Sequence, residues 1–290
     1  MRARRPEGPQ QRRCPGHKGD SMTQSARENC RLGRRQELTP EGHEKAKTYF
    51  QQAIEDDPDY LPAYAEYSYC LVREFQNGWG RDPLASLDEA LTLADKAVAL
   101  GDATDNKVPN DFRSRWYRAM VHWNRGDFDK SFVDFEDARK FILPERTVTD
   151  NADLDADMAE ALVYAGEPER AIALIEDARR RYPGHPYWYF WNLGRAYYAT
   201  RRYQDALDAI AAIKTPPNEF IPTPPNDVLL VVAASNAQLG KLDEARAAMA
   251  EFSQNDPDWS LEKSAAFHYR NDSDRQHWLD GLRKAGLKER

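Results

Sequence analysis

One spacing occurs three times along the chain and constrains its fold more than any other feature. An alanine, a large apolar residue, a small or apolar residue and a proline follow one another at steps of 4, 3 and 5 residues. The copies are Ala46, Phe50, Ala53, Pro58, then Ala171, Ile175, Ala178, Pro183, and then Ala245, Met249, Phe252, Pro257. Small residues let paired helices approach closely, and proline cannot continue a helix. The spacing therefore predicts repeated helix pairs, with each proline at the end of a second helix.

The composition agrees with a stack of helix pairs. The chain has 290 residues, 41% of them apolar and 31% charged. This length is large for one globular core, but a repeat unit packs only on its neighbours, so an array has no such limit. No run approaches the roughly 18 apolar residues of a membrane span. We expect an all-α protein, a right-handed α-α superhelix of about six helix pairs with a C-terminal capping helix.

The periodicity and the turn residues predict where these helices lie. The expected pairs are 23–37 with 40–56, 60–75 with 83–100, 110–124 with 128–142, 152–164 with 168–181, 186–200 with 203–213, and 226–239 with 242–254. Five prolines in residues 214–227 predict an extended connector along one edge of the stack. We therefore expect a disordered basic tail over 1–21, a solenoid over 22–257 and capping helices over 258–290.

The last segment departs from the repeat and carries its own helix signal. Ser273 and Gln276 form a capping box for a helix that starts near Asp274. Trp278, Leu279 and Leu282 lie on one face of that helix. Because the last unit of a stack would otherwise expose its apolar face, we interpret this helix as the cap.

Charge is unevenly distributed along the chain. Residues 1–21 hold six basic and two acidic residues, so they are net +4, and the remainder is −11 within a total of −7. A body this acidic argues against nucleic acid as the partner, because phosphate binding needs a basic face. The segment 1–21 is either a disordered tail, an extension before a start at Met22, or a basic arm for an acidic partner.

The residues that usually carry chemistry do not form a recognisable motif. Cys14, Cys30 and Cys70 include no CxxC pair and fit a reducing cytoplasm. None of the six histidines stands in a metal-ligand spacing, and the chain has no phosphate-binding glycine loop and no GxSxG motif. The acidic run Asp150, Asp153, Asp155 and Asp157 lies at a helix start, where capping explains the first three. We expect no enzyme activity, no cofactor and no metal.

Two-helix units with small residues at these places resemble tetratricopeptide repeats (TPR). The opening LTPEGHEKAKTYFQQAIEDDPDYLPAYA, residues 38–65, and the ending HWLDGLRKAGL, residues 277–287, resemble the TPR regions that follow a class III adenylate/guanylate cyclase domain in proteobacterial signalling proteins. The chain contains no cyclase domain, so cyclase activity does not transfer. The resemblance implies a free-standing relative of that module, or a fragment of a longer protein.

The TPR resemblance also implies which side chains face the concave groove, because the first helix of each pair lines it. Counting from the small-residue positions, the candidates for partner binding are Arg113, Trp116, Trp123, Asp153, Asp157, Glu160, Trp188, Trp191, Asn192, Arg195 and Tyr198. Aromatic and arginine side chains dominate binding hot spots. Two aromatic clusters would then flank an acidic patch, which suits an extended peptide with basic and apolar residues. The competing interpretation is that these aromatic residues only pack between helices.

Three functional hypotheses follow. The first is a cytoplasmic scaffold that binds a protein or peptide in its groove. The second is a regulatory sensor that binds a small molecule or peptide and controls a separate signalling output, such as a nucleotide cyclase. The third is an enzyme or an accessory subunit with an unusual site, which no motif supports.

Overall fold

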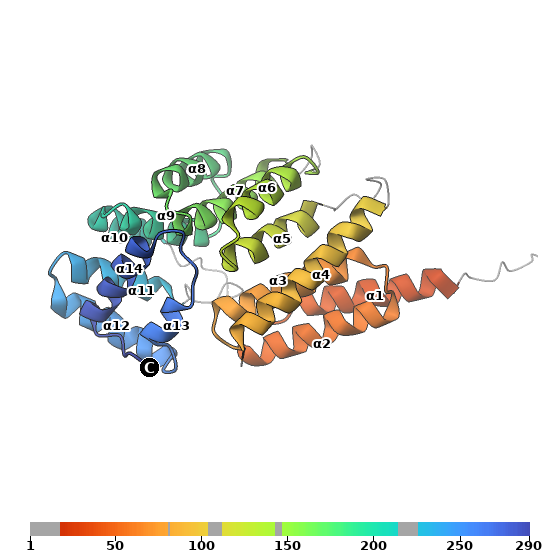
Figure 1. The fold of residues 1–290 in the computed structure, drawn as a ribbon, viewed down its shortest axis with the longest axis horizontal. Helices are drawn as coiled ribbons and strands as arrows, with labels where there is room; N and C mark the ends of the chain where they lie inside the picture. Colours follow the sequence, from red (N-terminus) through yellow and green to blue (C-terminus); the bar gives the residue numbers. More distant parts are fainter. Residues whose placement is uncertain (1–17, 81, 104–111, 143–146, 214–225) are drawn as a thin grey trace, which may run out of the picture.

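The computed structural model describes residues 18–80, 82–103, 112–142, 147–213 and 226–290, which form fourteen helices and no strand (Figure 1). The helices are α1 (Lys18–Arg34), α2 (Pro40–Asp56), α3 (Leu61–Gln76), α4 (Pro83–Ala103), α5 (Phe112–Asn124), α6 (Phe128–Arg139), α7 (Thr147–Tyr164), α8 (Pro168–Arg181), α9 (Trp188–Ala199), α10 (Tyr203–Ala211), α11 (Val228–Gln238), α12 (Leu242–Asn255), α13 (Leu261–Ala265) and α14 (Asp272–Ala285). The predicted all-α solenoid is confirmed.

The first twelve helices form six consecutive pairs, and the repeated spacing explains their packing. All nine residues of the three alanine-containing motifs that precede the prolines are buried. Helices α2, α8 and α12 each end two residues before the proline of their motif, at Asp56, Arg181 and Asn255. Figure 1 shows the pairs following one another along an arc, from α1 at one end to α12 near the other.

Several boundaries differ from the predictions. Helix α7 begins at Thr147, five residues before the predicted start at 152, and α1 begins at Lys18, inside the segment that was expected to be disordered. Residues 1–17, and residues 214–225 of the proline-rich connector, lie outside the described residues. The capping box at Ser273 is wrong, because Asn271 is the N-cap of α14 and Ser273 lies within the first turn.

The C-terminal segment does more than cover the last pair. Helix α14 packs on α11, α12 and α9. The stretch before it, residues 266–271, runs back toward the middle of the stack. There the Arg270 amide donates to the Tyr164 carbonyl at 2.9 Å, and the Phe267 ring lies 5.3 Å from that of Phe75 and 5.9 Å from that of Tyr164. Residues 259–278, here called the return segment, therefore tie the sixth pair to α3 and α7.

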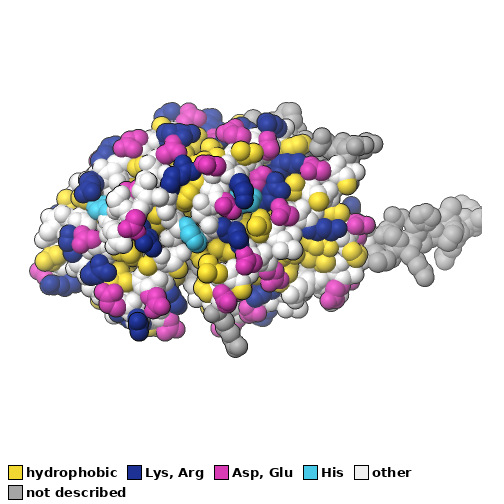
Figure 2. Space-filling model, viewed as in Figure 1, with side chains coloured by type: hydrophobic (Ala, Val, Ile, Leu, Met, Phe, Trp, Pro, Cys, Tyr) yellow, Lys and Arg dark blue, Asp and Glu magenta, His cyan; other side chains and the backbone are white. Residues whose placement is uncertain are grey.

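The surface carries both signs of charge. Figure 2 shows Lys and Arg side chains interspersed with Asp and Glu side chains over the face in view, with apolar side chains between them. Among the described residues, no helix is both long enough and apolar enough to cross a membrane.

Candidate ligand-binding cavity

A cavity of about 500 Å³ lies on the inner side of the stack, between the first helices of the repeats and the return segment. Helices α3, α5, α7, α9 and α11 contribute to its wall, and the return segment closes it with Trp259, Phe267, Tyr269 and Trp278. The volume lies within the range of about 300–1,000 Å³ that is usual for small-ligand sites. The return segment thus converts an open groove into a bounded cavity.

Eight of the eleven residues predicted for the groove line this cavity. They are Trp116, Asp153, Asp157, Glu160, Trp188, Trp191, Asn192 and Arg195. The other three lie elsewhere. Arg113 forms an ion pair with Glu66 at 3.3 Å. Trp123 is only 1% exposed and stacks on Tyr164 in the core. Tyr198 is buried, and its hydroxyl donates to the His277 carbonyl at 3.0 Å. This hydroxyl therefore joins α9 to α14 and does not face the cavity.

The prediction missed lining residues from the second and sixth pairs and from the return segment. Tyr69, Arg73 and Gln76 line the cavity from α3. They stand at i, i+4 and i+7, so one helical face carries all three, and this spacing was a usable signal. Asp227 and Tyr269 lie outside the third, fourth and fifth helix pairs, from which all the groove residues were predicted. The return of residues 266–271 to α7 depends on tertiary packing, and no local pattern indicates it.

A row of carboxyl groups on α7 forms the acidic wall. The Trp116 indole Nε1 donates to Asp157 Oδ2 at 2.9 Å, and the Tyr189 hydroxyl donates to Asp153 Oδ1 at 2.8 Å. Burial raises the pKa of both carboxyls, well above its usual value for Asp157. Burial likewise raises the pKa of Glu160 to about 7 against the opposing charges of Arg195 and Arg73. A cationic ligand group would lower all three pKa values, so this wall favours a positive charge.

The capping explanation for the acidic run holds for only one of its members. Since α7 begins at Thr147, only Asp150 lies in the first turn. Asp155 is 2% exposed and forms ion pairs with Arg139 at 2.5 Å and with Arg181. Asp153 lines the cavity. The run therefore serves two faces of α7, one that packs against α6 and α8 and one that faces the cavity.

Arg195 is held by aromatic rings. Its guanidinium carbon lies 4.9 Å from the ring centre of Tyr164, 5.4 Å from that of Trp191 and 5.0 Å from that of Trp278. Its Nη2 donates weakly to the Tyr269 hydroxyl at 3.4 Å. Cation–π contacts of this kind favour the charged guanidinium in a partly dehydrated site.

Four buried polar atoms on the cavity wall have no hydrogen-bond partner within the described part of the chain. Two are donors, Trp191 Nε1 and Arg195 Nε, and two are acceptors, Asn192 Oδ1 and Asp227 Oδ1. The Asn192 amide nitrogen is already used, because it donates to the Ala156 carbonyl at 2.9 Å. Leaving a buried polar group unpaired costs about 1–3 kcal/mol. A bound ligand with both donors and acceptors would remove part of this cost.

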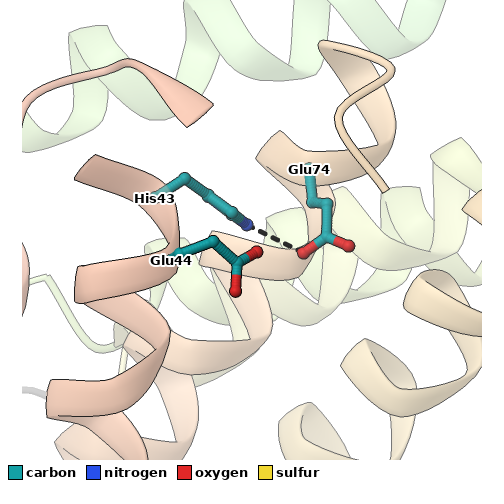
Figure 3. Close-up of side chains that lie close together, drawn as sticks. All are labelled: His43, Glu44 and Glu74. Carbon is teal, nitrogen blue, oxygen red and sulfur yellow. Dashed lines mark hydrogen bonds and ion pairs between the residues drawn. The ribbon is translucent and has the colours of Figure 1, made fainter. Parts of the chain in front are cut away.

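A second polar cluster joins α2 to α3, and its side chains lie close enough to consider a metal ion. His43, Glu44 and Glu74 approach one another (Figure 3), although no sequence motif predicted a metal here. His43 Nε2 lies 2.8 Å from Glu74 Oε2, and Lys47 Nζ lies 2.9 Å from the same oxygen and 3.2 Å from Glu44. The His43 hydrogen bond lowers the pKa of Glu74 to about 2. Because the Lys47 ammonium already pairs with both carboxylates, this geometry favours an internal ion-pair network over a metal site.

Comparison with known proteins agrees with this architecture. Residues 156–219 match the tetratricopeptide repeat family, and no curated protein matches the chain in sequence. The structure of pilF from Pseudomonas aeruginosa is 15% identical with a TM-score of 0.52, over 84% of this chain and 96% of that one. The Cut9–Hcn1 hetero-tetramer of the APC/C is 13% identical with a TM-score of 0.57, over 93% of this chain and 48% of that one. The chain therefore has the α-α superhelical fold of these structures, and its residues 156–219 are similar to tetratricopeptide repeats.

Proposed function

We propose that this protein is a non-catalytic scaffold that binds a protein or peptide partner in the cavity on its inner side. The observation that carries the proposal is the gathering of aromatic and charged side chains from α3, α5, α7, α9 and α14, which the fold leaves partly unpaired. TPR proteins serve as surfaces for protein interaction, and the similar Cut9–Hcn1 structure is a hetero-tetramer. A cytoplasmic, bacterial signalling context remains part of this proposal.

The chemistry of the wall indicates the kind of partner. Trp116, Trp188 and Trp191 offer large apolar area at low entropic cost. The carboxyls of Asp153 and Asp157 would attract and pair with a lysine or arginine side chain. A segment that presents a basic residue beside an apolar one would satisfy both.

The test is a comparison of partners captured from native cells by four forms of the full chain. These are the parent, Trp188→Ala, Asp157→Asn and Arg180→Ala, where Arg180 is an exposed residue of α8 that serves as the control. Mass spectrometry should find a protein that the parent and the control retain and that both cavity variants lose. Equal capture by all four forms would place partner binding on another surface and contradict the proposal.

The return segment favours one second candidate, a ligand-responsive regulator of a separate output such as a nucleotide cyclase. Because Trp259, Phe267 and Trp278 close the cavity, a ligand inside it would contact both the repeats and the C-terminal helices. Ligand binding could then change how α14 packs. A captured partner with a cyclase or other output domain, whose activity changes when a cavity ligand is added, would support this candidate over a passive scaffold.

A further inference from the structure

The cavity holds two arginines and four carboxyl side chains that form no ion pair with one another. The arginines are Arg73 and Arg195, and the carboxyls belong to Asp153, Asp157, Glu160 and Asp227. Outside the cavity the same chain pairs its partly buried arginines, as Arg118 does with Asp134 at 2.7 Å. Among the described residues, the Arg73 guanidinium makes only a long hydrogen bond, from Nη1 to Gln76 Oε1 at 3.5 Å. The separation of opposite charges is therefore a particular feature of this cavity.

The two sets are nevertheless near enough to influence one another. The charges of both Arg73 and Arg195 oppose the effect of burial on the pKa of Glu160 and of Asp227. Each group is fixed by its own element, since Arg73 lies on α3, Glu160 on α7, Arg195 on α9 and Asp227 just before α11. A charge that is buried without a partner costs several kcal/mol. The arrangement is costly for the free protein and suits a ligand that supplies both missing charges.

The polar atoms without a hydrogen-bond partner also favour a ligand with both kinds of charge. The buried Arg195 Nε and Trp191 Nε1 donors have no acceptor among the described residues. Elsewhere on the wall, Asp153 and Asp157 each keep one carboxyl oxygen that accepts no hydrogen bond from a described residue, because Tyr189 and Trp116 each donate to only one oxygen. The aromatic side chains of Trp116, Trp188 and Trp191 line the same cavity.

We propose that the cavity binds a dipolar ligand, with a carboxylate held by Arg73 and Arg195, a cationic group held by Asp153 and Asp157, and an apolar body between them. This proposal rests on the proposed function and adds the carboxylate and its position. Two sources share this chemistry: a peptide segment in which a basic and an acidic residue flank an apolar one, and a free zwitterion of the amino-acid type.

Two matched series of probes test the proposal by calorimetric titration of the full chain. The peptide series is acetyl-Arg-Leu-Glu-amide, the same peptide with citrulline for arginine, and the same peptide with glutamine for glutamate. The free series is arginine, citrulline and agmatine, which lacks the carboxylate. Each loss of one charge should weaken binding about tenfold, the usual worth of a charge-assisted hydrogen bond. Binding by the first series alone identifies a peptide ligand, and binding by the second identifies a free zwitterion.

Variants assign each charge to its side of the cavity. Arg73→Gln should lose most of the preference for the glutamate peptide over the glutamine peptide, because only Arg195 remains, while it still prefers arginine to citrulline. Asp157→Asn should show the reverse pattern. Arg73→Lys keeps the charge and should keep part of the preference for glutamate, and Arg180→Gln on the outer surface should behave as the parent. Circular dichroism of each variant verifies the fold, and the probe series on the parent chain gives a result even if one variant is unfolded.

Three results would overturn the proposal: equal affinity of the parent for all members of a series, unchanged preferences in Arg73→Gln and Asp157→Asn, or no binding of any probe at about 1 mM, the limit of weak specific recognition. A partner that depends on Trp188 in the capture experiment, together with no preference for a carboxylate, would leave the scaffold intact and remove only the dipolar ligand.

Discussion

Single residues in the cavity lower the free energy of unfolding, although the fold alone does not require them there. Glu160 is 7% exposed and forms neither a hydrogen bond nor an ion pair with another described residue. Its folded-state pKa of about 7 lies above the ordinary value of 4.5. The folded chain therefore binds a proton at this site more tightly than the unfolded chain, and the ionised carboxylate destabilises the fold as pH rises.

Replacing Glu160 by glutamine should therefore stabilise the protein in a pH-dependent way. The cost of the carboxylate is fully present above pH 7 and disappears below about pH 4.5, so Glu160→Gln should raise the free energy of unfolding by up to about 3 kcal/mol at pH 8. At pH 5 the gain should fall below about 1 kcal/mol. Urea unfolding at both pH values measures it, and a gain that does not change with pH would show that Glu160 is not a dehydrated carboxylate.

At the same scale, the sequence predicted some side chains of the cavity and not others. Trp116, Trp191 and Arg195 were predicted because regular repeats place them on the inner face of a first helix. Trp123 was misplaced, because stacking on Tyr164 buries its ring in the core. Tyr269 belongs to no helix and reaches the cavity only through the fold of the return segment, so periodicity could not indicate it.

At the scale of elements, α14 depends on a close approach to α9. A Cβ added to Gly281 would overlap the Tyr198 hydroxyl and would lie 3.1 Å from Ala234 Cβ. The glycine is needed for space rather than for an unusual backbone angle. The predicted face of Trp278, Leu279 and Leu282 is buried, although the exact start of the helix was not predicted, because Asn271 and Ser273 are both good N-caps.

The substitution Gly281→Ala separates helix propensity from packing. Propensity alone predicts a gain of about 1 kcal/mol, whereas the overlap with Tyr198 predicts a net loss of about 1–3 kcal/mol. Thermal unfolding of the variant should therefore show destabilisation. Tyr198→Phe in the same background should recover part of the loss, and a stabilised Gly281→Ala would contradict the described packing of α14.

Removal of α14 should destabilise the protein more than Gly281→Ala does, because it removes all the packing of this helix on its neighbours. Helix α11 buries Leu230, Val231 and Ala234, and α14 is one of its main neighbours. A chain that ends at Asn271 should expose this face, melt at a lower temperature and aggregate on heating. Scanning calorimetry with light scattering measures both, and an unchanged melting temperature would show that α14 is not a cap.

At the scale of the whole molecule, the six pairs could be predicted from the sequence because each repeat contacts mainly its neighbours. Local spacing then contains most of the information about the stack. The bounded cavity could not be predicted, because it needs contacts such as that between Phe267 and Phe75, which lie far apart in the sequence. The superhelix supplies the inner wall, and the return segment closes it.

The most direct test of the account is the affinity of the captured partner segment for the parent and for Trp191→Ala, measured by calorimetric titration with circular dichroism of both proteins. Trp191 lines the cavity, is half-buried and leaves its Nε1 unpaired. If it is a binding residue, the substitution should weaken binding by about 2 kcal/mol, or about 30-fold, with unchanged helicity. Unchanged affinity, or an unfolded variant, would show that Trp191 only packs in the core and would contradict the assignment of the cavity as the binding site.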